Sequence, residues 1–78
     1  MTFSYEFAQT WFNARLLMLR RAMSAYEVRL HCKATQEDLL MFHERGVLSL
    51  DEYTHALTQL LSARVTRIAE VAIQEACH

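Results

Sequence analysis

The chain of 78 residues contains no proline and a single glycine, Gly46. Proline and glycine are the residues that most often end helices and form tight turns, so neither interrupts the first half of the chain. Alanine, leucine, glutamate, arginine, glutamine and methionine dominate the composition, and all of them favour helices. The apolar residues do not alternate as they would in strands. The sequence therefore predicts an all-α protein.

Capping residues indicate where the helices begin and end. Thr35 can cap a helix that has an acidic first turn. Ser49 and Glu52 form a capping box, in which the serine oxygen accepts a backbone hydrogen bond and the glutamate reaches back to the serine amide. Gly46 lies where a glycine in the left-handed conformation would end the preceding helix. The sequence predicts three helices, at about 4–33, 36–45 and 50–76.

The two outer helices predicted in this way are nearly equal in length, about 45 and 40 Å at 1.5 Å per residue. Two matched helices joined by a short one suit an antiparallel helical hairpin, and we expect residues 1–78 to form a single helical domain of this kind. A chain this short buries a small fraction of its surface, and association with another chain is one common way to stabilise it. We therefore expect the hairpin to dimerise into a helical bundle.

The first predicted helix has two apolar stripes on a helical wheel. The first stripe comprises Tyr5, Ala8, Phe12, Leu16, Leu19, Met23, Tyr26 and Leu30. The second stripe lies about 120° away at ~100° per residue. It comprises Phe3, Phe7, Trp11, Ala14, Met18, Ala22 and Ala25, with Arg21 and Arg29 at its margins. The last predicted helix has one stripe, made by Leu50, Tyr53, Leu57, Leu60, Leu61, Val65, Ile68, Val71 and Ala72.

In a single hairpin, the stripe of the last helix packs on the first stripe and leaves the second stripe uncovered. Long apolar strips tend to associate, and tryptophan and methionine are favoured at protein interfaces. We predict that the second stripe, with its two flanking arginines, binds a second copy of the chain or another protein. In the alternative, the short helix folds back over the stripe, but a helix of about ten residues is only ~15 Å long.

Two pairs of residues could supply metal ligands: His31 with Cys32, and Cys77 with His78. Neighbouring residues on a helix point about 100° apart, and the ligand spacing of zinc sites is absent. We therefore predict no metal and no cofactor. Cys32 is expected to be a small buried apolar residue.

Glu52 and His55 have the spacing of ligands in di-iron helix bundles, but they lie on the polar side of the last predicted helix, and Glu52 is needed as a cap. The chain has no glycine-rich loop and no nucleophile–base spacing, and a thin bundle lacks room for a substrate pocket. We predict that the chain is not an enzyme and binds no small-molecule substrate.

The charge distribution disfavours nucleic acid and membranes as partners. The net charge is −1, and Arg15, Arg20, Arg21 and Arg29 point in four directions on the wheel, so they form no basic stripe. The longest aliphatic run, residues 16–19, is much too short to span a bilayer. Because the sequence has no signal-peptide pattern and only two cysteines, we expect a cytoplasmic protein.

Residues 39–61 combine an apolar turn, a glycine, a hydrophobic pair, a cap and an acidic–aromatic pair. The residues concerned are Leu39, Leu40, Gly46, Val47, Leu48, Ser49, Asp51, Glu52, Tyr53, Leu60 and Leu61. This pattern resembles the short helix–turn–helix element called SHOCT. The resemblance covers under a third of the chain and implies an oligomerisation or interaction module rather than an enzyme.

Together these features predict a small non-enzymatic regulator, inhibitor or adaptor that binds protein through helix–helix packing and acts as a homodimer. The first alternative is a dimeric RNA-binding protein of the ROP type, whose helical architecture would be the same. The second alternative is an oligomer that depends on a metal.

Overall fold

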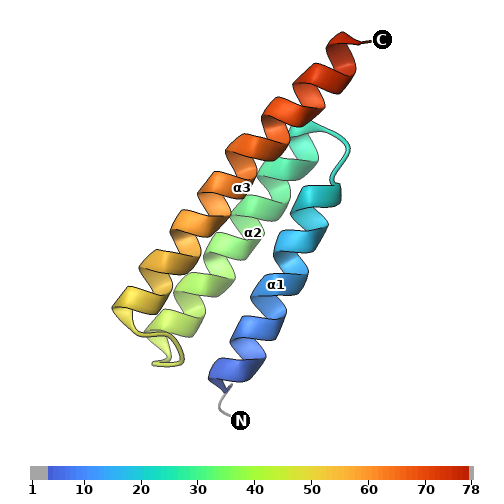
Figure 1. The fold of residues 1–78 in the computed structure, drawn as a ribbon. Helices are drawn as coiled ribbons and strands as arrows, with labels where there is room; N and C mark the ends of the chain where they lie inside the picture. Colours follow the sequence, from blue (N-terminus) through green and yellow to red (C-terminus); the bar gives the residue numbers. More distant parts are fainter. Residues whose placement is uncertain (1–3, 78) are drawn as a thin grey trace.

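The computed structural model describes residues 4–77, and all regular structure in that range is helical. The helices are α1 (Tyr5–Arg21), α2 (Ala25–Glu44) and α3 (Leu50–Ala76). They pack side by side, each antiparallel to the next in sequence, and form a bundle 48 Å long and 21 by 16 Å across (Figure 1). The prediction of an all-helical chain is confirmed. The C-terminal end of α3 extends beyond the other two helices (Figure 1).

A break at residues 22–24 separates α1 from α2, and the expectation of one continuous helix over 4–33 is wrong. Ala22 has an extended backbone conformation, and Ser24 caps α2. The Ser24 hydroxyl accepts a hydrogen bond from the Glu27 amide at 3.1 Å, while the Glu27 carboxylate accepts from the Met23 amide at 3.1 Å. These bonds satisfy amides that the new helix leaves without intrahelical partners, so a helix can end here without proline or glycine.

The position of the break changes the architecture from the predicted hairpin to a three-helix bundle. Residues 25–33 belong to α2, which therefore has 20 residues instead of about ten. Thr35, the predicted cap of a short helix 36–45, lies inside α2 and is fully buried. Its hydroxyl donates to the His31 carbonyl at 2.6 Å. Such a bond to the preceding turn is the usual way for a buried threonine to remain within a helix.

The turn between α2 and α3 agrees with the sequence. Gly46 has a φ of 77°, the left-handed conformation predicted for it, and the Val47 amide donates to the Phe42 carbonyl at 2.9 Å. Ser49 and Glu52 make both bonds of the predicted capping box. These local bonds fix the direction in which α3 leaves the turn.

The core runs along the axis of the bundle and takes residues from all three helices. Its largest fully buried side chains are Phe42, Leu19, Leu39, Leu60 and Val28. Arg67 closes the core near the break, because its Nε donates to the Ala22 carbonyl at 2.9 Å. A cation at that position interacts favourably with the C-terminal end of α1.

The break also divides the predicted first stripe. Its members on α1 are buried, except for the half-exposed Tyr5: Ala8, Phe12, Leu16 and Leu19. Its members in and after the break are exposed: Met23, Tyr26 and Leu30. The expectation that these three residues belong to the core is wrong, because the chain turns back at residues 22–24, so Met23 in the break and the other two on α2 face solvent.

We expect Ser24→Ala to lower the free energy of unfolding by about 1 kcal/mol, because the first amides of α2 lose their acceptor. Urea denaturation followed by circular dichroism measures this change. The control is Ser62→Ala, at an exposed serine within α3, which should be neutral or slightly stabilising because alanine favours helices. Equal stability of Ser24→Ala and the wild type would contradict the role assigned to the cap.

Candidate interaction surface

The structure distributes the predicted interface residues over two helices and their connection. Phe3 lies outside the described residues. The members on α1 are Phe7, Trp11, Ala14, Met18 and Arg21; Ala22 lies in the connection, and Ala25 and Arg29 are on α2. Because the helix breaks at residue 22, these residues do not form one continuous stripe. Ala22 is buried in the core and so is not available to a partner.

Part of the second stripe is covered by α2. The ring of Trp11 lies 5.5 Å from the ring of Phe42, edge to face, and the ring of Phe7 lies 6.4 Å from it in a similar arrangement. The guanidinium carbon of Arg15 lies 5.4 Å from the centre of the Trp11 ring. The indole face thus offers the arginine a cation–π contact. Phe42 lies within the stretch predicted as the short helix 36–45. That stretch therefore folds back over this end of the stripe, as the alternative from the sequence allowed.

The remaining part of the stripe is open to solvent. Phe7 and Met18 are half exposed, and Ala14 between them is exposed. Eleven residues separate Phe7 from Met18, a distance of about 16 Å along the helix. We call these three residues, with the edge of Trp11, the α1 surface. A strip that combines an aromatic ring, methionine and alanine has the composition of a helix-packing interface.

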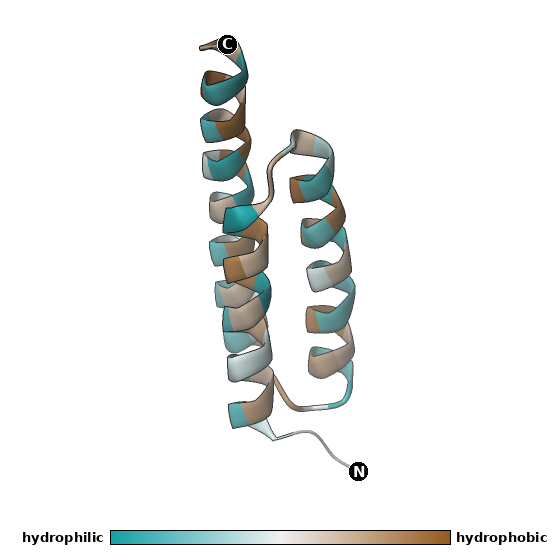
Figure 2. Ribbon diagram, turned by 90° about the vertical axis from the view of Figure 1, so that its right-hand side faces the viewer, coloured by the Kyte–Doolittle hydropathy of each residue, from teal (hydrophilic) through white to brown (hydrophobic). Residues whose placement is uncertain are grey.

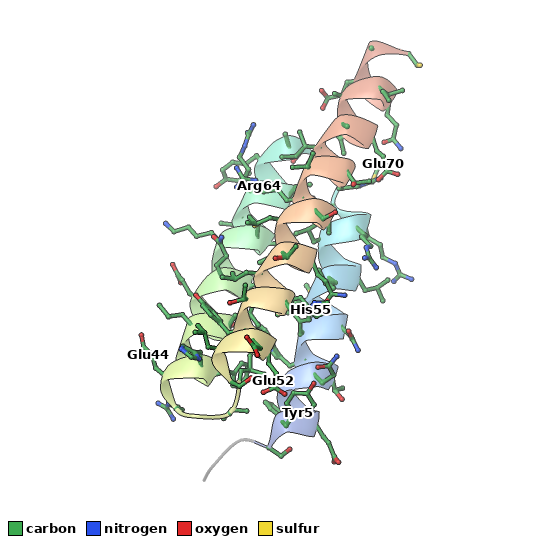
Figure 3. The ribbon with its side chains drawn as sticks, turned by 60° about the vertical axis from the view of Figure 1, so that its left-hand side comes forward. Tyr5, Glu44, Glu52, His55, Arg64 and Glu70 are labelled. Atoms are coloured by element: carbon green, nitrogen blue, oxygen red, sulfur yellow. The ribbon has the colours of Figure 1, made fainter. Side chains whose placement is uncertain are left out.

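The groove between α1 and α3 differs in character from the α1 surface. It has a volume of about 390 Å³ and an apolar floor that includes Phe12 and Ala56. Polar residues surround it: Tyr5, Gln9, Asp51, Glu52, His55 and Gln59. Tyr5, Glu52 and His55 lie at the same end of the bundle (Figure 3). Sequence reasoning predicted no pocket in a bundle of this size, so the groove is a feature that it missed.

Glu52 is committed to its structural role, since its Oε1 accepts from the Ser49 amide at 2.8 Å. His55 on the next turn is exposed. Within residues 4–77, no three histidine, cysteine or acidic side chains are grouped closely enough to hold a metal ion. The described geometry therefore gives the Glu52–His55 pair no further ligands.

Cys32 is buried, as predicted, and Cys77 is exposed at the end of α3. Burial raises the pKa of the Cys32 thiol, and the positive charge of Arg64 opposes part of that rise. A thiol with a raised pKa and little access to solvent is unreactive. Cys32 therefore behaves as a small apolar residue of the core.

The apolar residues of α3 are arranged differently from the predicted single core stripe. The residues of α3 that are buried are Ala56, Leu60, Ala63 and Val71. The predicted core members Leu50, Leu61, Val65 and Ala72 are exposed instead, and Val65 has 69% of its surface accessible. Because α3 packs against two helices, the side that it buries differs from the predicted stripe and includes Ala56 and Ala63. These small residues let the neighbouring helices approach α3 closely.

This difference leaves a second apolar surface on the outside of α3. A shallow groove there is lined by Leu61, Arg64, Val65, Ile68, Ala69 and Ala72. We call the five apolar members of this set the α3 surface. The sequence analysis did not predict that these residues are exposed. A signal was present, because a spacing of alternately four and three residues is typical of a helix-packing seam; it is shown by Leu61, Val65, Ile68 and Ala72.

Comparison of the chain with protein-family models, with curated proteins and with solved structures found no match. Among residues 4–77, no helix has an apolar stretch sufficient to cross a membrane.

Two adjacent residues on α1 separate the core from the α1 surface. Leu19 is fully buried and Met18 has 47% of its surface accessible. We expect Leu19→Asp to unfold the chain, because an unpaired buried charge costs several kcal/mol against a total stability of roughly 5–15 kcal/mol. Met18→Asp should retain the helical circular dichroism spectrum and the cooperative melting of the wild type. Unfolding of both variants would show that the α1 surface is part of a continuous core.

Proposed function

We propose that this chain is a small non-enzymatic regulator, inhibitor or adaptor that binds another protein through helix packing and acts as a homodimer. The observation that carries the proposal is the α1 surface. Its Phe7 and Met18 are each half exposed on a folded bundle whose core is already complete. Exposed apolar strips of this kind on small domains are characteristic of binding surfaces.

The chemistry of the α1 surface favours a protein helix as the ligand. Methionine adapts to irregular apolar partners, and Trp11 presents a large rigid edge beside it. The exposed Ala14 between Phe7 and Met18 allows a partner backbone to approach closely. The resemblance of residues 39–61 to a SHOCT element would imply an interaction module as well.

We place this activity in the cytoplasm, a reducing compartment. Both cysteines are free. Disulfides commonly stabilise small domains in oxidising compartments. This bundle instead encloses Cys32 as a buried thiol.

The alternative, a dimeric RNA-binding protein of the ROP type, draws support from one groove between α1 and α3. That groove contains Arg20 and Arg67 beside Ser62 and Thr66. However, Arg67 already donates to the Ala22 carbonyl, and its guanidinium lies 3.9 Å from the Glu70 carboxylate. An acidic side chain at that position disfavours phosphate, so the protein-binding proposal is the stronger one.

The proposal predicts that tagged chain retrieves a protein from extracts of the cells that encode it, and that nuclease treatment does not release this protein. Met18→Asp should abolish the recovery, because the added carboxylate would be buried in the interface. The matched control is Asn13→Asp, which adds the same charge at an exposed site about 140° around α1.

Three outcomes of this experiment would contradict the proposal in different ways. Recovery that requires intact RNA would favour the RNA-binding alternative. Equal recovery by Met18→Asp would place the binding surface elsewhere on the chain. Equal loss in Asn13→Asp would show that any added charge on α1 is sufficient to abolish binding.

A further inference from the structure

The α3 surface has the spacing of a helix–helix seam, and most of it is left open by the bundle; only its member Ile68 also packs against the core. Leu61, Val65, Ile68 and Ala72 recur at intervals of four, three and four residues, the spacing that keeps side chains facing one partner helix. Leu61, Val65 and Ala72 are exposed, and Ile68 is partly buried. A seam of this length on the outside of a small bundle needs a partner helix.

The sizes of the side chains change along this seam in one direction. The N-terminal half has the large residues Leu61 and Val65, and the C-terminal half has Ala69, Ala72 and Ala76, with the exposed Ile73 about 40° beyond Ala69 around the helix. Two copies of α3 that run antiparallel and cross near Ile68 would place Leu61 opposite Ala76 and Val65 opposite Ala72. Large residues would then fill the space beside small ones at both ends. Two parallel copies would place large beside large and leave a gap between the alanines.

The charges at the edge of the seam favour the same antiparallel arrangement. Arg64 and Glu75 are eleven residues apart, which places them within about 20° of each other around the helix. Figure 3 shows Arg64 and Glu70 projecting from opposite sides of α3, so Glu70 is not at this edge. In the antiparallel pair, Arg64 of each copy lies beside Glu75 of the other. In a parallel pair, Arg64 would face Arg64.

The end of α3 gives a further reason to expect a partner at this position. Residues 72–77 are all exposed, and apolar residues continue along the part of α3 that extends past α2 (Figure 2). Helical turns without tertiary contacts are only marginally stable. In the antiparallel pair, Leu61 and Val65 of the second copy pack on this extension.

We propose that two copies of the chain associate through their α3 surfaces, as an antiparallel pair of α3 helices related by a two-fold axis near Ile68. This inference rests on the proposed homodimer and names the helix that forms it. It also leaves the α1 surface of each copy free, so the dimer presents two identical binding surfaces to another protein. The pairing is isologous, since the same residues contribute from both copies.

Disulfide cross-linking tests the pairing and its direction. The variants are Ile68→Cys and Leu61→Cys, each in a chain that also contains Cys77→Ser so that the exposed native thiol cannot react. In the antiparallel pair, the two copies of residue 68 lie beside the two-fold axis, within reach of a disulfide. The two copies of residue 61 are displaced by about 22 Å along the helices. Leu61 is exposed, whereas Ile68 is partly buried and packs against the core. The circular dichroism spectrum and melting of both variants are therefore measured first, to show that each bundle is folded.

After mild oxidation, Ile68→Cys should give at least about ten times more disulfide-linked dimer than Leu61→Cys, because only its sulfurs satisfy the distance requirement. Efficient cross-linking of both variants would contradict the inference by showing a parallel pair. A chain that is dimeric by sedimentation but cross-links in neither variant would place the contact outside α3 and leave the proposed homodimer intact. A monomeric chain would overturn both the inference and the homodimer.

Discussion

The start of α2 depends on the Ser24 hydroxyl and the Glu27 carboxylate, which accept hydrogen bonds from the amides of residues 27 and 23. These bonds satisfy amides that the break would otherwise leave without partners, so α2 can begin at residue 25 without proline or glycine. Arg67 holds the connection in place from α3 by donating to the Ala22 carbonyl. These few polar contacts at one end of the bundle stabilise the reversal of the chain between α1 and α2, which gives three helices instead of two.

A three-helix arrangement determines which apolar residues remain at the surface. Helix α2 covers Trp11 through Phe42 but leaves Phe7 and Met18 half exposed. Because α3 contacts two helices, its Ala56 and Ala63 face inward, while Leu61 and Val65 face outward. The α1 surface and the α3 surface are therefore separate apolar surfaces on different helices. One surface for self-association and one for a target would let a very small chain act as a bivalent binder, with the gain in avidity that two linked sites allow.

Features that depend on a few neighbouring residues could be predicted from the sequence. The Ser49–Glu52 capping box and the left-handed Gly46 are of this kind, because their bonds stay within one turn. Ser24 and Glu27 have the same capping-box spacing. Because no proline or glycine lies nearby, the sequence analysis assigned both residues to the polar face of one long helix. The orientation of α3 could not be predicted in this way, because it depends on how many helices pack against it. A prediction from hydrophobicity places Val65 in the core. In the structure Val65 is exposed, and the smaller Ala56 and Ala63 are buried where the helices pack closely.

The central claim is that this bundle has apolar surfaces which require a partner, the first of which is a second copy of the chain. Sedimentation equilibrium of the purified chain across micromolar concentrations tests this claim most directly. We expect a particle of twice 9.1 kDa that dissociates on dilution, because a helix pair of this size makes a small interface. A particle of 9.1 kDa at every concentration would contradict it.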